Sequence, residues 1–169
     1  MQKSRPAPNA IGLLNHLFFT GSSALLLMAM YSSLRVVLLV YNRDQLGGTT
    51  ASMLAEAFFN GLRFDLRLVV FACLPLLLAL PSIRAMAART FFRCWLTIFA
   101  SITLLLGVIE LDFYREFNQR LNGLVFQYLK EDPKTVLSML WYGFPVVRYV
   151  LAWVAATWLI AWILQKLDR

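Results

Sequence analysis

The sequence predicts an all-α integral membrane protein with about four transmembrane helices and an interfacial amphipathic helix on the outward side. Apolar residues make up 60% of the 169 positions, and the mean hydropathy is +0.65. Soluble globular domains contain roughly 45–50% apolar residues. The apolar residues are also gathered into long blocks with basic residues between them. Blocks of this kind indicate helices that cross a bilayer, so residues 1–169 are predicted to form a single membrane domain.

The first predicted span covers residues 11–41, after a short, basic N-terminus that we expect to be unstructured up to Ala10. A cleaved signal peptide has an apolar region of only roughly 7–15 residues, so this longer run predicts a retained span. Arg35 lies near its far end, where a long basic side chain can reach the interface. Asn15 and His16 are expected to form interhelical hydrogen bonds, because a lone histidine lacks the partners of a metal site.

A second helical pattern begins near Ser52 and ends at Leu80, where Pro81 stops it. Its apolar part predicts a span over residues 60–80. The earlier half carries polar residues at steps of four, three and four, namely Glu56, Asn60, Arg63 and Arg67. This spacing places the polar side chains in one stripe along a helix.

The third predicted span covers residues 94–109 and leads into the outward amphipathic segment, residues 110–142. The first part of this segment separates into a polar and an apolar helical face. The polar face contains Asp112, Arg115, Glu116, Gln119 and Arg120, and the apolar face contains Phe113, Phe117, Leu121, Leu124 and Tyr128. A segment with two such faces favours a helix that lies in the membrane interface.

The last predicted span covers residues 145–164 and follows a break at Gly143, Phe144 and Pro145. Tryptophan side chains favour membrane interfaces and packed positions between helices. Four of them lie in or just before this run, at Trp141, Trp153, Trp158 and Trp162. Their positions support a membrane span here.

The charges that flank the four spans predict the orientation of the chain. One side carries Lys3, Arg5, Arg84, Arg89, Arg93, Lys166 and Arg169 against Asp168 alone. The other side carries basic and acidic residues in equal number. By the positive-inside rule, both termini are expected to be cytoplasmic, and the two polar loops are expected to face outward. Topology thereby explains the net charge of +7, and no nucleic-acid partner is expected.

On this topology, the polar stripe of the second helix and the amphipathic segment meet at the outward face. A guanidinium group can form two parallel hydrogen bonds with phosphate oxygens, so arginines there are candidates for binding a lipid headgroup. The candidates are Arg63, Arg67, Arg115 and Arg120, with Asp65, Asp112 and Glu116 expected to orient them. The alternative is that these charges pair with one another among the lipid headgroups, which their balance favours.

The sequence predicts no catalytic residue, metal ligand or cofactor site in this chain. It contains no nucleophile elbow, glycine-rich phosphate loop, His-Glu-x-x-His motif or carboxylate cluster of the metal-site type. If the chain takes part in a reaction, we expect it to act as the membrane part of something larger.

Three segments carry a family resemblance: FFNGLRFDL (58–66), ELDFYREFNQRLN (110–122) and YLKEDPKTVLSMLWYGFP (128–145). They resemble the N-terminal membrane region of lipoteichoic-acid-synthase-like phosphoglycerol transferases, which belong to the sulfatase-like superfamily. The resemblance implies five spans in the cytoplasmic (inner) membrane of a bacterium, followed by an extracytoplasmic sulfatase-like domain. In that domain, a threonine nucleophile and a divalent metal such as manganese or magnesium would move phosphoglycerol from phosphatidylglycerol.

The resemblance implies a lipid-facing and domain-docking role at most for Arg63, Asp65, Asp112, Tyr114, Arg115, Arg120 and Asn122. The sequence stops just after the fourth predicted span, so the fifth span and the catalytic domain are expected elsewhere. The implied function is a membrane module that positions a lipid headgroup and a catalytic domain during cell-envelope glycerophosphate or glycolipid modification. A second hypothesis is a free-standing small membrane protein that scaffolds a complex or binds an envelope protein. A transporter is disfavoured, because no acidic residue lies in the middle of an apolar run.

Overall fold

The computed structural model describes residues 8–45, 47–117, 119, 123 and 132–168, and every regular element in these ranges is helical. The elements are α1 (Pro8–Tyr41), the 3-10 helix η1 (Arg43–Gln45), α2 (Ala51–Leu78), α3 (Ile83–Met86), α4 (Arg89–Phe117), α6 (Pro133–Gly143) and α7 (Val146–Leu167). The predicted all-α fold class is therefore confirmed.

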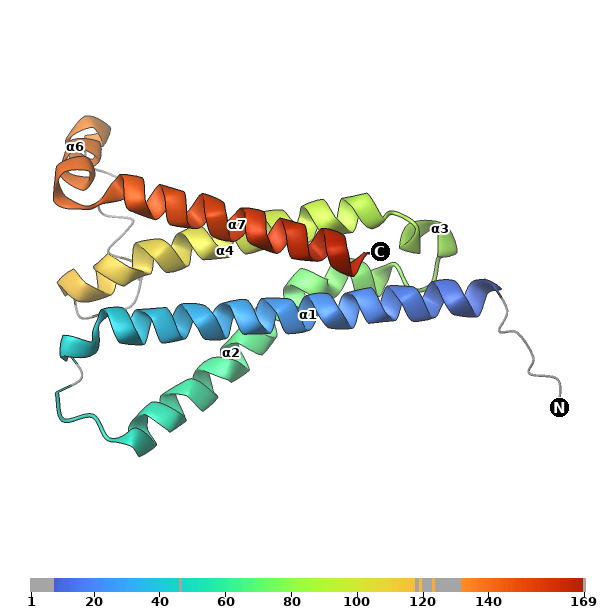
Figure 1. Ribbon diagram of the computed structural model, residues 1–169, viewed down its shortest axis with the longest axis horizontal. Coiled ribbons are helices and arrows are strands. Elements are labelled where there is room, and N and C mark those ends of the chain that lie inside the picture. Colours follow the sequence, from blue (N-terminus) through green and yellow to red (C-terminus); the bar gives the residue numbers. More distant parts are fainter. Residues whose placement is uncertain (1–7, 46, 118, 120–122, 124–131, 169) are drawn as a thin grey trace.

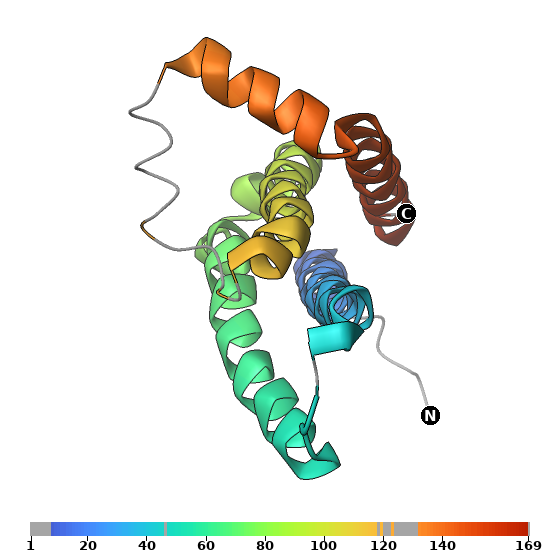
Figure 2. The same cartoon turned by 90° about the vertical axis from the view of Figure 1, so that its left-hand side faces the viewer.

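The four long helices, α1, α2, α4 and α7, alternate in direction along the bundle (Figure 1). The start of α1, the short helix α3 and the end of α7 lie together at one end, which we call the α3 end. The helix η1, the start of α2 and α6 lie at the opposite end, which we call the α6 end. Viewed along the bundle, α6 runs across the direction of α1, α4 and α7, and the start of α2 diverges from them (Figure 2).

Three of the described helices are long and apolar enough to cross a membrane: α1 over Gly12–Tyr41, α4 over Arg89–Glu116, and α7 over Val146–Leu167. The helix α2 is also long, with 28 residues. Its most C-terminal stretch of 18 residues, however, contains Arg63, Asp65 and Arg67. The sequence predicts four spans. Because of these three charges, α2 is too polar to count as a membrane-spanning helix by composition.

The helix α4 is longer than the predicted third span, because it continues without interruption through Glu110 to Phe117. The first part of the predicted amphipathic segment is thus an extension of α4. A later part of that segment forms α6, which lies across the end of the bundle (Figure 2). The predicted face residues Arg120, Leu121, Leu124 and Tyr128 lie outside the described residues.

The apolar core fills the half of the bundle nearer the α3 end. Its fully buried side chains include Leu27 of α1, Leu76 of α2, Leu96 of α4 and Leu164 of α7. The most extensive helix contacts pair α1 with α2 and α4 with α7. Many large apolar side chains are instead exposed on the outside of the bundle. An apolar exterior of this kind suits a lipid environment.

His16 links α1 to the end of α2 inside this core. Its Nε2 atom lies 2.9 Å from the carbonyl oxygen of Leu76, and its ring meets the ring of Phe92 edge to face with centroids 5.6 Å apart. The Leu76 oxygen is available because the N–H of Leu80 bonds to Leu77 where α2 ends. The predicted interhelical hydrogen bond of His16 is confirmed, whereas Asn15 is exposed.

Candidate functional site

A layer of charged residues closes the bundle at the α3 end. The carboxylate of Asp168, just after α7, lies 3.4 Å from Nη1 of Arg89 and 3.3 Å from Nε of Arg93, both on α4. The Arg89 guanidinium also lies over the ring of Phe19 on α1, with its Cζ atom 5.1 Å from the ring centroid. These contacts join α1, α4 and α7, and we call Arg89, Arg93 and Asp168 the α3-end layer.

A second polar layer, formed by Tyr41, Asp112 and Tyr149, joins the same three helices at the α6 end. The Tyr41 hydroxyl donates to Oδ1 of Asp112 at 2.7 Å, and the Tyr149 hydroxyl donates to Oδ2. The two hydroxyl oxygens are 3.1 Å apart. One carboxylate therefore receives a donor from both neighbouring helices. We call these three residues the α6-end layer.

The distance between the two layers matches the thickness of a bilayer. The α3-end layer contacts α1 at Phe19, and the α6-end layer includes Tyr41 of the same helix. At a rise of about 1.5 Å per residue, these two positions are about 33 Å apart along α1. The hydrocarbon core of a bilayer is about 30 Å thick. By the same rise, Arg35 lies about 9 Å from Tyr41 toward the α3 end. If the two layers mark the edges of the hydrocarbon core, Arg35 lies just inside the edge at the α6 end.

Arg35 of α1 forms a buried ion pair with Asp65 of α2. Its Nη2 atom lies 2.8 Å from both carboxylate oxygens, and the two side chains are only 17% and 10% exposed. Its Nη1 atom donates to the carbonyl oxygen of Phe58 at 3.1 Å. A Cβ atom added at Gly61 would overlap the guanidinium group, so the glycine provides the space in which Arg35 lies against α2.

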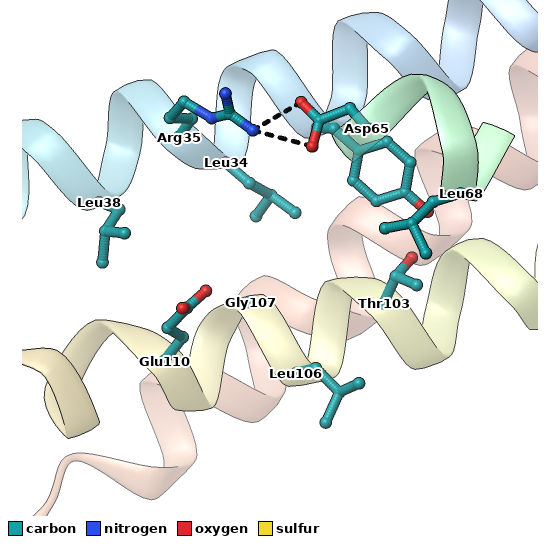
Figure 3. A pocket seen from close by; sticks show the side chains of 10 residues that line it. Leu34, Arg35, Leu38, Asp65, Leu68, Thr103, Leu106, Gly107 and Glu110 are labelled. Atoms are coloured by element: carbon teal, nitrogen blue, oxygen red, sulfur yellow. Dashed lines mark hydrogen bonds and ion pairs between the residues drawn. The ribbon is translucent and has the colours of Figure 1, made fainter. Parts of the chain in front are cut away.

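The ion pair borders a half-open cavity of about 250 Å³ between α1, α2 and α4 (Figure 3). Its lining residues are Tyr31, Leu34, Arg35, Leu38, Asp65, Leu68, Thr103, Leu106, Gly107 and Glu110. The cavity thus has one cationic and two anionic side chains in its wall, together with two hydroxyl groups. We call it the polar cavity.

A second hollow, of about 230 Å³, lies on a different face of α2 and is lined by Asn60, Arg63, Phe64 and Arg67. All four residues are exposed. The Arg67 guanidinium lies over the Phe64 ring, with its Cζ atom 5.2 Å from the ring centroid. In the described part of the chain, no carboxylate forms an ion pair with Arg63 or Arg67. We call this hollow the arginine groove.

The structure separates residues that sequence reasoning placed in one group. Asp65 does not orient Arg63 or Arg67, because residues two apart on a helix point to different sides and Asp65 faces α1. It orients Arg35 instead. Asp112 holds Tyr41 and belongs to the α6-end layer.

The remaining predicted residues lie at or beyond the end of α4. The guanidinium of Arg115 lies over the Tyr41 ring, with Cζ 5.8 Å from its centroid. The carbonyl oxygen of Arg115 also accepts a hydrogen bond from Gln45 of η1 at 3.1 Å. Tyr114 is half-buried on α4. Arg120 and Asn122 lie outside the described residues.

Sequence reasoning missed Arg35, Tyr31 and Tyr149 as members of polar clusters. Each lies within or beside an apolar run, where a single polar residue gives no periodic signal. The pairing of Arg35 with Asp65 spans 30 positions in sequence and depends on how α1 and α2 pack. One available signal was the presence of a charged residue within a predicted span, which is costly unless paired.

Within the described ranges, no three His, Cys, Asp or Glu side chains gather closely enough to hold a metal ion. Comparisons with protein-family models, with curated proteins and with solved structures give no match for this chain. Its function must therefore be argued from the arrangement of its own residues.

Proposed function

We propose that the chain is a membrane module that binds the phosphate of an anionic phospholipid headgroup in the arginine groove. The supporting observation is the pair of exposed guanidinium groups of Arg63 and Arg67, which line one hollow with Asn60 and have no described carboxylate partner. Guanidinium groups and an amide can all donate hydrogen bonds to phosphate oxygens. The Phe64 ring, which also lines the hollow, provides an apolar surface for the lipid's acyl chains.

The depth of the arginine groove supports binding of a lipid rather than a soluble anion. The same turns of α2 contain Gly61 and Asp65, which contact Arg35, so the groove lies at about the depth of Arg35 along the bundle. That depth is just inside the proposed edge of the hydrocarbon core, next to the headgroup layer that contains the phospholipid phosphates. Long arginine side chains can extend from there to the headgroup level.

The orientation expected from the sequence would place this groove on the outward face. Arg84 of α3 and the α3-end layer, together with Lys166, give the α3 end an excess of basic side chains. By the positive-inside rule we infer that the α3 end is cytoplasmic in a bacterial inner membrane. The arginine groove, η1 and α6 would then face the envelope side.

The family resemblance extends the proposal to cell-envelope lipid modification. Of the three resembling segments, one contains Asn60, Arg63 and Phe64 of the arginine groove, one includes the end of α4, and one includes α6 at the same end of the bundle. We therefore propose that phosphatidylglycerol is the bound lipid, and that a sulfatase-like catalytic domain docks at the α6 end. A coding sequence for such a domain, continuous with this chain or beside it, would support the extension, and an unrelated neighbouring gene would contradict it.

Lipid retention in native mass spectrometry tests the groove itself. The solubilised protein is titrated with short-chain phosphatidylglycerol or phosphatidylcholine, and the bound fraction is measured. The double variant Arg63→Gln/Arg67→Gln should lower phosphatidylglycerol affinity about tenfold or more, the loss of at least about 1.4 kcal/mol. The double variant Arg43→Gln/Lys134→Gln is the matched control, because it removes the same charge from exposed positions at the same end.

The control variant should change phosphatidylglycerol affinity less than about twofold, because scattered surface charges contribute little. Wild-type retention in the Arg63→Gln/Arg67→Gln protein would contradict the proposal. An equal loss in both double variants would show that only net charge matters.

A further inference from the structure

The helix α6 lies apart from the packed bundle. It runs across the direction of α1, α4 and α7 (Figure 2), and it makes no extensive contact with any other described helix. Three of its side chains near the C-terminal end are strongly exposed: Met139 is 51% exposed, Trp141 57% and Tyr142 89%. Large apolar side chains that are exposed close together mark an interaction surface.

The sequence of α6 gives the helix a polar and an apolar side. Lys134, Ser138 and Tyr142 follow one another at intervals of four residues, so they form a stripe along the helix, and Thr135 lies beside it. We call these four residues the hydroxyl stripe, because its polar groups are hydroxyls apart from one ammonium group. All other residues from 136 to 141 are apolar. A helix with two such sides is suited to a boundary between water and an apolar phase.

The connection to α7 sets the depth of α6 in the membrane. Tyr149 of α7 belongs to the α6-end layer, which marks the proposed edge of the hydrocarbon core. Val146, the first residue of α7, is three residues before Tyr149, so it lies about 5 Å beyond that edge. The headgroup region on each side of a bilayer is about 5–8 Å thick. Because α6 ends at Gly143, its C-terminal end lies at the level of the headgroups.

The composition of α6 and its position beside α7 favour a lipid surface as its partner. The lipid-facing exterior of the bundle begins directly after α6, because Val147 and Val150 in the first turns of α7 are also exposed. Tryptophan and tyrosine side chains, which α6 carries at its C-terminal end, are enriched at the level of the headgroups. A single lysine attracts an anionic surface only weakly, so burial of apolar side chains would supply most of the binding energy.

We infer that α6 binds the surface of the leaflet at the α6 end, with Met139 and Trp141 inserted below the headgroups and the hydroxyl stripe toward water. It recognises the lipid surface through apolar burial, whatever the charge of the headgroups. This surface is separate from the arginine groove, which is proposed to bind an anionic phosphate, and the inference does not rest on that proposal. Because α6 is joined to α7 by only two residues, its insertion fixes the height of the α6 end relative to the leaflet.

Nitroxide labels on two neighbouring residues test which side of α6 enters the membrane. In a chain with Cys73 and Cys94 replaced by serine, Met139→Cys or Ser138→Cys provides a single labelling site, and both positions are exposed. The purified chain is reconstituted into phosphatidylcholine vesicles. Electron paramagnetic resonance then measures collisions of the nitroxide with oxygen, which concentrates among acyl chains, and with a water-soluble nickel chelate. The label at position 139 should meet mainly oxygen and lie about 5–10 Å into the boundary between headgroups and acyl chains. The label at position 138 should meet mainly the nickel chelate.

A second pair of labels, at Trp141→Cys and Tyr142→Cys, should repeat this difference further along the helix, with position 141 in lipid and position 142 in water. Mainly nickel collisions at all four positions would overturn the inference, because α6 would then stand in water. Few collisions with either reagent at positions 139 and 141 would also overturn it, since the apolar side would then be packed against protein.

The lipid composition of the vesicles tests whether charge contributes. Addition of phosphatidylglycerol, or the variant Lys134→Gln, should leave the depth of the label at position 139 unchanged. Insertion only in the presence of phosphatidylglycerol would contradict recognition through apolar burial. Arg63→Gln/Arg67→Gln should also leave this depth unchanged, so the arginine groove and the α6 surface can fail separately.

Discussion

The ion pair between Arg35 and Asp65 is the contact that most directly holds α1 against α2 at the α6 end, and its removal should be costly. We consider Arg35→Ala, Asp65→Asn and the double variant. At 2.8 Å and an effective dielectric constant near 20, Coulomb's law gives about 6 kcal/mol of attraction. Much of this offsets the hydration that both groups lose, so the net effect depends on leaving one charge behind.

Removing one partner of a buried ion pair costs about 3–5 kcal/mol. Because the two side chains keep 17% and 10% exposure, we expect the lower part of this range, about 3 kcal/mol for each single variant. The double variant leaves no uncompensated charge, so it should cost about 2 kcal/mol less than the sum of the single variants. Free energies of unfolding can be measured by reversible sodium dodecyl sulfate titration in mixed micelles, followed by circular dichroism.

Gly61→Ala makes this prediction specific to the structure. In the wild type, the added Cβ displaces the Arg35 guanidinium, and we expect a loss of about 2 kcal/mol. In the Arg35→Ala background, the obstacle is gone and the higher helix propensity of alanine should stabilise the protein by up to about 1 kcal/mol. Gly21→Ala is a matched control, since it is a helical glycine with open space around it.

Additive effects of Arg35→Ala and Asp65→Asn within about 0.5 kcal/mol would refute the reasoning. So would a Gly61→Ala effect of the same size and sign in both backgrounds. Either result would mean that α1 and α2 do not meet through this contact.

Three further predictions concern the contacts between helices. Tyr149→Phe should lower the free energy of unfolding by about 1–2 kcal/mol, since Asp112 loses one of its two hydroxyl donors; an unchanged value would contradict the α6-end layer. His16→Phe should cost about 1–3 kcal/mol by leaving the Leu76 carbonyl unpaired, as read by thermal unfolding in detergent. Asp168→Asn should cost about 1 kcal/mol, and this loss should shrink in high salt.

The apolar blocks predict where the four long helices lie. The pattern that begins near Ser52 corresponds to α2, which begins at Ala51. The break at Pro145 corresponds to the start of α7 at Val146. The boundary of α4 differs from the prediction, because the sequence predicts a span that ends at residue 109 and the helix continues through Glu110 and Asp112 to Phe117. The carboxylate of Asp112 accepts hydrogen bonds from Tyr41 of α1 and Tyr149 of α7, and no local pattern in the sequence contains these contacts.

The polar clusters could not be predicted from spacing alone. The sequence predicts that Asp65 orients Arg63 and Arg67, but the packing of α1 against α2 pairs Asp65 with Arg35 instead. Gly61 carries no signal of its role in the sequence, since its function is to leave space for a residue 26 positions away. Pairing of this kind is fixed by the register between helices, which depends on the whole core.

The most direct test of the account is the accessibility of single cysteines on the two ends of the bundle. In a chain without Cys73 and Cys94, we place a cysteine at Gly47, near the α6 end, or at Thr90, near the α3 end. A membrane-impermeant maleimide added to intact cells should label the cysteine at position 47, and should label the one at position 90 only after the membrane is permeabilised. Labelling of both positions from the same side would contradict a bundle that spans the bilayer.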